Sequence, residues 1–256
     1  MRLVLTRPRP QCADWLARLA AEGIAAVALP LIAIEAGGDP RAAQAAWQRL
    51  PGALLAMFVS PNAVERFFVA RPQGEVWPAD TLAATVGPGS AEALRAQGVP
   101  AELLRQPPAD AASFDSEHLW PLLSSLDWRG RRALILRGEG GRDWLADRLR
   151  EQGAEVEAFH IYRRSCPQLD EAEQGLLSEV QAAPGRHVWL FSSSEAIHNL
   201  ASLGFKPAPV SLAIATHPRI ADTARALGWP HVVSARPDAA AVAAACRALP
   251  GAAPTI

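Results

Sequence analysis

The chain repeats itself in order along its 256 residues, and this repetition limits the possible folds more than any single segment does. Three motifs of the first half return about 130 residues later, each as a short apolar run followed by a turn and an amphipathic stretch. The motif pairs begin at Val4 and Ile135, at Phe58 and Phe191, and at Val86 and Ala215. The sequence therefore predicts two related halves built from similar strand-turn-helix units.

Apolar runs bounded by Gly, Pro, Ser or Arg alternate with longer amphipathic stretches, which is the pattern of parallel strands joined by crossover helices. Residues 3–6 are predicted to form the first strand and Pro8–Glu22 its helix, which Gly23 ends. The other predicted strands span residues 24–29, 54–59, 82–86, 133–136, 188–191, 212–215 and 231–233. We therefore expect an α/β fold with two similar lobes, each containing a parallel sheet flanked by helices.

Two extended segments predict how the chain passes between the lobes. Residues 30–37 follow the second strand, and residues 158–165 have the same β-rich, alternating character. If both are linker strands, lobe 1 combines residues 1–33 with residues 165–256 and is discontinuous in sequence. Lobe 2 then consists of residues 38–158.

The charge composition excludes several classes of function. Half of the residues are hydrophobic, a fifth are charged and the net charge is −1, which is typical of a globular protein and argues against a nucleic-acid partner. All but one of the 25 basic residues are arginine, so Schiff-base chemistry would have to use Lys206. Because arginine binds carboxylates and phosphates through paired N–H donors, the expected partner is an anionic small molecule.

The cysteines and histidines predict neither a disulfide framework nor a metal site. Cys12, Cys166 and Cys246 are far apart and form no Cys-x-x-Cys pair, which favours a reducing compartment. The six histidines show no metal-ligand spacing. Because no export signal is visible and no apolar stretch approaches the roughly 20 residues of a membrane span, we expect a cytoplasmic protein with no membrane partner.

Small polar residues and arginines follow the predicted strands, in the turns where open parallel sheets bind ligands. They suit a polyanion held by many hydrogen bonds, whereas the alternative is helix capping for the serines and a tight turn for the glycines. The Gly138-Glu139-Gly140-Gly141 run lacks the spacing of a dinucleotide site, so no cofactor is expected. The candidate binding residues are Thr6, Arg7, Ser60, Asn62, Ser90, Arg137, Gly138, Gly140, Arg142, Ser192, Ser193, Thr216 and His217.

Tyr162 is the only tyrosine of the chain, and it lies in the second predicted linker strand. A phenol at this position could donate a proton or a hydrogen bond to a departing hydroxyl group. The alternative is a packing role, in which the hydroxyl is bound to the backbone. The residues alone leave both interpretations open.

Several segments together resemble the uroporphyrinogen-III synthase family in order and spacing, over essentially the whole chain. They are residues 3–8, 30–32, 58–64, 86–88, 136–142 and 161–164. The resemblance implies two α/β lobes joined by a two-stranded linker, with the first lobe discontinuous. It also implies a hydro-lyase without a cofactor that cyclises hydroxymethylbilane to uroporphyrinogen III, with loss of water and inversion of ring D through a spiro intermediate. Tyr162 matches the family tyrosine that assists departure of the hydroxyl.

Two motifs depart from the family pattern. Val59 stands where the family often has a hydroxyl residue, and residues 214–219 replace its frequent Ile-Gly-Pro-x-Thr-Ala turn. Ser90, Ser192 and Ser193 are therefore the stronger expectations for substrate binding. The alternative functions are a non-catalytic two-lobed binding protein for an anionic small molecule and a nucleotide-sugar transferase with two α/β lobes. A monomer is expected.

Overall fold

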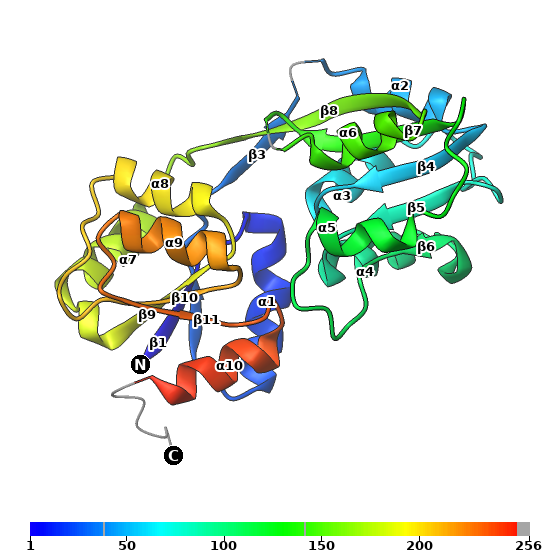
Figure 1. Cartoon of the computed structure of the whole chain (residues 1–256). Helices are drawn as coiled ribbons and strands as arrows, with labels where there is room; N and C mark the ends of the chain where they lie inside the picture. Colours follow the sequence, from blue (N-terminus) through cyan, green and yellow to red (C-terminus); the bar gives the residue numbers. More distant parts are fainter. Residues whose placement is uncertain (38, 141, 250–256) are drawn as a thin grey trace. The chain divides into compact units, whose positions relative to one another are not determined.

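Figure 1 shows the computed structural model, which describes residues 1–37, 39–140 and 142–249. The backbone divides into two units: unit 1 contains Met1–Ala33 and the residues from Ser165 onward, and unit 2 contains Ile34–Arg164. Gly38, where lobe 2 is predicted to begin, and Gly141 lie outside the described residues. Unit 2 includes most of the residues predicted as linker strands, because these pair within its sheet.

Unit 1 contains a parallel sheet with the strand order β11-β10-β9-β1-β2. Helices α1 and α10 cover one face, where Trp15 and Val242 pack against Leu3 and Leu190, and α8 and α9 lie on the other face (Figure 1). Its strands are β1 (Arg2–Leu5), β2 (Ala26–Ala28), β9 (His187–Phe191), β10 (Leu212–Ala215) and β11 (His231–Ser234). Its helices are α1 (Arg9–Ala21), α7 (Glu171–Ala182), α8 (Ser194–Ser202), α9 (Pro218–Ala226) and α10 (Ala239–Ala248), with a 3-10 turn at Pro184–Arg186.

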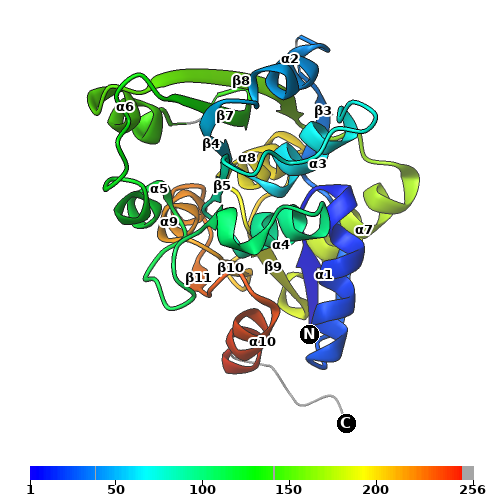
Figure 2. The same cartoon turned by 90° about the vertical axis from the view of Figure 1, so that its right-hand side faces the viewer.

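Unit 2 contains a sheet with the order β3-β8-β7-β4-β5-β6, in which the pairs from β8 to β6 are parallel. Helices α2, α3 and α4 cover one face and α5 and α6 the other (Figure 2). Its strands are β3 (Ala33–Ala36), β4 (Ala53–Phe58), β5 (Leu82–Thr85), β6 (Leu104–Arg105), β7 (Arg132–Gly138) and β8 (Glu155–Ser165). Its helices are α2 (Ala42–Arg49), α3 (Pro61–Val69), α4 (Pro88–Ala96), α5 (Ser116–Leu119) and α6 (Trp144–Glu151), with 3-10 turns at Ala101–Leu103 and Trp120–Leu122.

The central strands are continuous apolar runs because helices cover both faces of each sheet. All residues of β5, β9 and β10 are buried, and alternate side chains along β9 enter different cores. In that strand Leu190 packs with α1 and α10, whereas Trp189 makes edge-to-face contacts with Phe205 and Trp229 on the opposite face. This is the sequence pattern of a parallel sheet that is buried on both sides. The predicted α/β class is confirmed.

The two units share one topology, and the sequence repeats fall on equivalent strands. The segment β1-α1-β2 of unit 1 corresponds to β7-α6-β8 of unit 2, and β9-α8-β10-α9-β11 corresponds to β4-α3-β5-α4-β6. Phe58 and Phe191 are accordingly the last residues of β4 and β9. Each unit thus takes one β-α-β segment from one half of the sequence and its remaining strands from the other half.

Several strand lengths differ from the sequence-based expectation. Strand β2 is shorter than the predicted strand at residues 24–29, and β7 is longer than the one at residues 133–136. The edge strand β6 is only two residues long and was not predicted, because a two-residue strand has no hydrophobic periodicity. Strand β8 runs unbroken over 11 residues, although only residues 158–165 of it were predicted as extended. Its first half contains exposed and partly buried residues, and pairing along the whole of β7 holds it in the sheet.

Among the described residues, no helix combines the length and apolarity needed to cross a membrane. The three cysteines are free thiols, of which Cys12 and Cys246 are buried and Cys166 is exposed.

Burial is expected to protect two of the three thiols from alkylation. Burial raises the pKa of the Cys12 thiol and of the Cys246 thiol to about 11, so little thiolate forms there at neutral pH. At about pH 7.5 we expect iodoacetamide to modify Cys166 in the folded protein. In denaturant we expect it to modify all three cysteines. Mass spectrometry of tryptic peptides measures this, and rapid modification of Cys12 in folded protein would contradict the packing of α1.

Candidate active site

Each sheet has one topological switch point, which is a pair of neighbouring strands whose connections lead to opposite edges of the sheet. In unit 1 this point lies between β1 and β9, and in unit 2 between β7 and β4. Ligands of open α/β sheets bind beyond the carboxyl ends of the strands at such points. Thr6 and Ser192 follow the two strands in unit 1, and Ser60 and Gly138 lie at the corresponding ends in unit 2.

Tyr162 and Ser60 meet at this edge of unit 2. The Tyr162 hydroxyl lies 2.9 Å from the Ser60 Oγ, and the tyrosine side chain is only 1% exposed within the aromatic core of the unit. Ser60 is half-buried and is the N-cap of α3, where its Oγ accepts a hydrogen bond of 3.2 Å from the Ala63 N–H. The partner of the phenol is therefore a serine side chain and not the backbone. These residues are 102 positions apart, which no local pattern reveals.

Gly138 provides the space for the Tyr162 ring. A Cβ atom on Gly138 would lie 2.6 Å from the Cε2 and 2.8 Å from the Cζ of Tyr162, far inside van der Waals contact. Gly138 is the last residue of β7 and stands opposite Tyr162 in the register with β8. The close approach that this glycine permits is thus to a side chain of the protein.

The two arginines predicted at the glycine-rich turn have protein partners. Arg137 is buried, forms an ion pair with Asp143 and donates a hydrogen bond of 2.6 Å to the Gly140 carbonyl, so it braces the turn from within. Gly140 has a φ of 74°, the left-handed conformation that glycine adopts most easily. Arg142 forms an ion pair of 2.5 Å with Glu117. Each arginine thus pairs with a carboxylate of the protein, whereas the sequence-based expectation was a carboxylate of a ligand.

The polar residues of unit 1 make contacts that stabilise the ends of its strands and helices. The buried Thr6 hydroxyl donates a hydrogen bond of 2.7 Å to the Leu190 carbonyl and so ties β1 to β9. Ser193 caps α8 by accepting from the Glu195 N–H, and His217 caps α9 through its Nδ1. Ser192 and Thr216 are half-buried beside these caps. Capping is therefore present at Ser60, Ser193 and His217.

Ser90 and Asn62 are buried in the first turns of α4 and α3. The N-cap of α4 is Gly87, so Ser90 is not a capping residue. Thr85 was missed by the sequence interpretation: it ends β5 as a fully buried residue, and its hydroxyl has no hydrogen-bond partner among the described residues. Its position directly before the Val86-Gly87-Pro88 turn is the signal that could have drawn attention to it.

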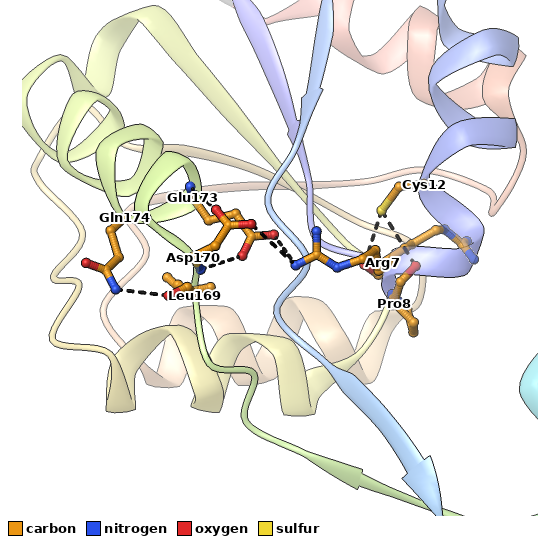
Figure 3. Close-up of polar contacts among 8 residues, drawn as sticks. Arg7, Pro8, Cys12, Leu169, Asp170, Glu173 and Gln174 are labelled. Carbon is orange, nitrogen blue, oxygen red and sulfur yellow. Dashed lines mark hydrogen bonds and ion pairs between the residues drawn. The ribbon is translucent and has the colours of Figure 1, made fainter.

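Arg7 follows β1 and lies against α1. Its guanidinium stacks over the Trp15 ring at 4.1 Å and donates a hydrogen bond of 3.1 Å to Gln11, while its Nε has no partner among the described residues. Burial lowers the pKa of the Arg7 guanidinium to about 10. Figure 3 shows the Cys12 thiol, which donates to the Arg7 and Pro8 carbonyls and fixes the turn before the helix.

The described residues contain no group of three His, Cys, Asp or Glu side chains placed to hold a metal ion. The strand ends of unit 2 carry a phenol, hydroxyl groups, arginines and helix N-termini, and those of unit 1 carry hydroxyl groups, an arginine and helix N-termini. These features define a two-unit α/β protein with sites suited to an anionic organic ligand.

The comparisons with known proteins identify the family. The family described as uroporphyrinogen-III synthase HemD matches residues 13–244. The uroporphyrinogen-III synthase of Salmonella typhimurium is 33% identical over 178 residues, which are 69% of this chain and 70% of that protein. The enzyme of the same name from Proteus mirabilis is 33% identical over 165 residues, which are 64% of this chain and 80% of that protein. The chain belongs to the uroporphyrinogen-III synthase family.

A solved structure agrees with this assignment at the level of the fold. The crystal structure of the uroporphyrinogen-III synthetase from Helicobacter pylori superposes with a TM-score of 0.57 at 16% sequence identity. The match covers 96% of this chain and 98% of that chain. The α/β architecture is therefore that of the family.

Proposed function

We propose that the chain catalyses the uroporphyrinogen-III synthase reaction, in which hydroxymethylbilane loses water and closes to uroporphyrinogen III with inversion of ring D. The observation that carries the proposal is the family match over residues 13–244. The hydrogen-bonded pair of Tyr162 and Ser60, at the strand ends where such sheets bind ligands, supports it with a group able to protonate a leaving hydroxyl.

The reaction places modest demands on the protein's own chemistry. The electron-rich pyrroles of the substrate expel the hydroxyl and leave a reactive azafulvene. The protein must then hold the linear molecule so that the last ring attacks through its substituted carbon and forms a spiro intermediate. Positioning of this kind can supply a large part of a rate enhancement. No step requires a cofactor.

We assign the substrate carboxylates to the polar strand ends of both units. Helix N-termini favour negative charge there, and arginine and hydroxyl side chains add hydrogen bonds. In unit 1 the assigned residues are Thr6, Arg7, Ser192, Ser193, Thr216 and His217, and in unit 2 they are Ser60, Asn62, Ser90, Arg137, Gly138, Gly140 and Arg142. Tyr162 is assigned the departure of the hydroxyl.

We further propose that the protein acts as a cytoplasmic monomer. Residues 1–33 with 165–256 and residues 38–158 are then the two lobes, and residues 30–37 and 158–165 are the linker strands between them.

The test is an isomer assay. Freshly generated hydroxymethylbilane is supplied to the protein, the products are oxidised, and the type I and type III uroporphyrins are separated. Because spontaneous closure gives type I, protein-dependent type III supports the proposal. If folded protein at high concentration gives type I alone, the synthase proposal fails, and the remaining function is that of a non-catalytic binding protein for an anionic small molecule.

Arg7 is expected to lower stability and support activity at the same time. Its lowered pKa corresponds to roughly 3 kcal/mol of unfavourable charge burial, which the Trp15 contact, the Gln11 hydrogen bond and partial exposure offset in part. We expect Arg7→Met to raise the free energy of unfolding by about 1 kcal/mol and to weaken substrate binding, seen as a higher KM. Denaturant unfolding and the isomer assay measure the two effects, and a variant that is less stable would contradict this account of the burial.

The sign of the corresponding pH effect follows from the lowered pKa. The folded protein releases the Arg7 proton near pH 10, whereas the unfolded chain keeps it to higher pH. The unfavourable contribution of Arg7 is thus fully present below pH 10 and declines as the pH rises through that value. The stability difference between Arg7→Met and the parent protein is therefore expected to shrink above pH 10.

A further inference from the structure

The ring of Tyr162 is too deeply buried to contact a ligand. Its hydroxyl, however, forms a hydrogen bond with Ser60, which lies just after the carboxyl end of β4. The Tyr162 side chain is 1% exposed, whereas Ser60, 2.9 Å away, is half-buried. A ligand at the end of β4 therefore meets the serine before it meets the tyrosine.

An irregularity in β8 places the tyrosine on this side of the sheet. Arg137 stands opposite His160 and Gly138 opposite Tyr162, so Ile161 is an extra residue on β8. Such a bulge turns the following side chain to the face it would otherwise avoid, and bulges are frequent beside active sites. Ile161 and Tyr162, although consecutive, both enter the core beneath α3. The bulge thus aims the phenol at the N-terminus of α3.

Gly138 permits this position of the Tyr162 ring because it has no side chain. A Cβ there would lie 2.6 Å from the Tyr162 Cε2, so any other residue would push the ring away from Ser60. The backbone adds a further contact, because the Glu139 N–H donates a hydrogen bond of 3.0 Å to the Tyr162 carbonyl. Both the ring and the backbone of Tyr162 are therefore fixed against the end of β7.

From this arrangement we propose that Ser60 is a further catalytic residue, which passes a proton from Tyr162 to the leaving hydroxyl of the substrate. The inference rests on the proposed function. Gly138 acts as a positioning residue for the same step, because it sets the distance between the phenol and the serine.

The hydrogen-bonding capacity of Ser60 sets the direction of the transfer. A serine hydroxyl accepts two hydrogen bonds and donates one. Ser60 Oγ accepts from the Ala63 N–H, and when it also accepts from Tyr162, its own proton has no acceptor on these two partners and can be donated to a ligand. With the opposite direction, the serine proton would be used within the protein and the buried phenol would have to contact the substrate itself.

The proposed step balances. The carbon–oxygen bond of the hydroxymethyl group breaks, its electron pair stays on oxygen, and the pyrrole nitrogen supplies electrons to the carbon. Ser60 gives its proton to the departing oxygen, which leaves as water, and takes the proton of Tyr162. The phenolate lies beside the N-terminus of α3, where the helix dipole favours negative charge. The proton that the closing ring releases when it regains aromaticity restores the phenol, so no proton is consumed.

The test compares single and double variants in the isomer assay. We expect Ser60→Ala to lower kcat for type III by about a hundredfold, as Tyr162→Phe does. In a shared proton path the double variant loses no more than either single variant. Ser60→Thr, which keeps the hydroxyl, should restore most of the rate. Ser60→Gly retains acceptable helix capping, and it should be as slow as Ser60→Ala.

Matched controls separate the relay from the helix cap. Asp238 caps α10 through its side chain, and Asp238→Gly removes that side-chain hydrogen bond from a helix end, as Ser60→Gly does at α3, without touching Tyr162, so kcat should stay unchanged. Because Tyr162 is the only tyrosine, a carbon-13 label at the tyrosine ring Cζ gives one resonance. That resonance should move in Ser60→Ala and in Gly138→Ala and remain in place in Asp238→Gly.

The outcomes are distinct. If Ser60→Ala keeps its rate within about threefold of the parent protein, or if the losses of the two single variants multiply in the double variant, the relay is overturned while the synthase function stands. If Gly138→Ala is slow and its tyrosine resonance is unchanged, the positioning role of Gly138 is overturned. Parent protein that forms no type III isomer overturns both the function and the relay.

Discussion

Replacing Tyr162 with phenylalanine is expected to lower the rate of type III formation by about a hundredfold or more, because it removes the proton donor of the dehydration step. The ring itself stays, so the packing within the core of unit 2 and the space above Gly138 are unaffected. Spontaneous closure continues in the variant and gives the type I isomer. The isomer ratio at low enzyme concentration therefore reports the loss more sensitively than total porphyrin does.

The stability of the same variant tells a catalytic role from a structural one. Losing the phenol leaves Ser60 with one hydrogen-bond partner fewer, an effect of about 1 kcal/mol on the free energy of unfolding. A well-folded variant with low type III turnover is the expected result. Unchanged turnover and isomer ratio in Tyr162→Phe would show that the tyrosine packs the strand without taking part in the chemistry.

Trp189→Ala is expected to be the most destabilising single change in unit 1. The indole is 1% exposed in the central strand β9, and its ring centroid lies 4.9 Å from that of Phe205 and 5.9 Å from that of Trp229. Removing a buried indole destabilises a core by about 3–5 kcal/mol, since the neighbours do not fill the cavity. This is a large part of the roughly 5–15 kcal/mol that stabilises a folded protein.

The effect of this substitution should be confined largely to one unit. Denaturant unfolding followed by circular dichroism should show an early transition from unit 1, and the labelled Tyr162 resonance should report unit 2 as still folded. Trp189→Phe, which keeps an aromatic ring, should lose less than half as much stability. Equal midpoints for the parent protein and Trp189→Ala would contradict the tight packing around β9.

The strands that sequence predicts well are those whose packing follows from a local pattern. The predicted strand at residues 212–215 coincides with β10, because four consecutive buried residues between turns have few other uses in an α/β fold. The helix after β1 is recovered nearly to its ends, since Gly23 with its φ of 73° terminates it. The bulge at Ile161 escapes such reasoning, because only the pairing with β7 shows which residue is extra.

The sequence shows which polar residues follow the strands, but it does not show the contacts that they make. The turns after the strands do contain hydroxyl groups, because serine is a preferred N-cap residue of the helix that follows each strand. What the sequence does not carry is the choice of partners. Arg142 meets Glu117, which lies 25 positions away, and Arg137 turns inward to Asp143. The partner of an arginine depends on the conformation of the folded turn. The polar residues of the sequence therefore do not show which arginine stabilises the turn and which one faces a ligand.

The exchange of segments between the two halves of the sequence determines when each unit can be completed during synthesis. Every strand of unit 2 has been made once residue 165 is translated, whereas β1 has to wait for its neighbour β9, which ends at Phe191. Translation-coupled folding usually favours the N-terminal part of a chain. Here the first β-α-β segment leaves the ribosome before its partner strand β9 is made, so all strands of unit 2 are available before those of unit 1.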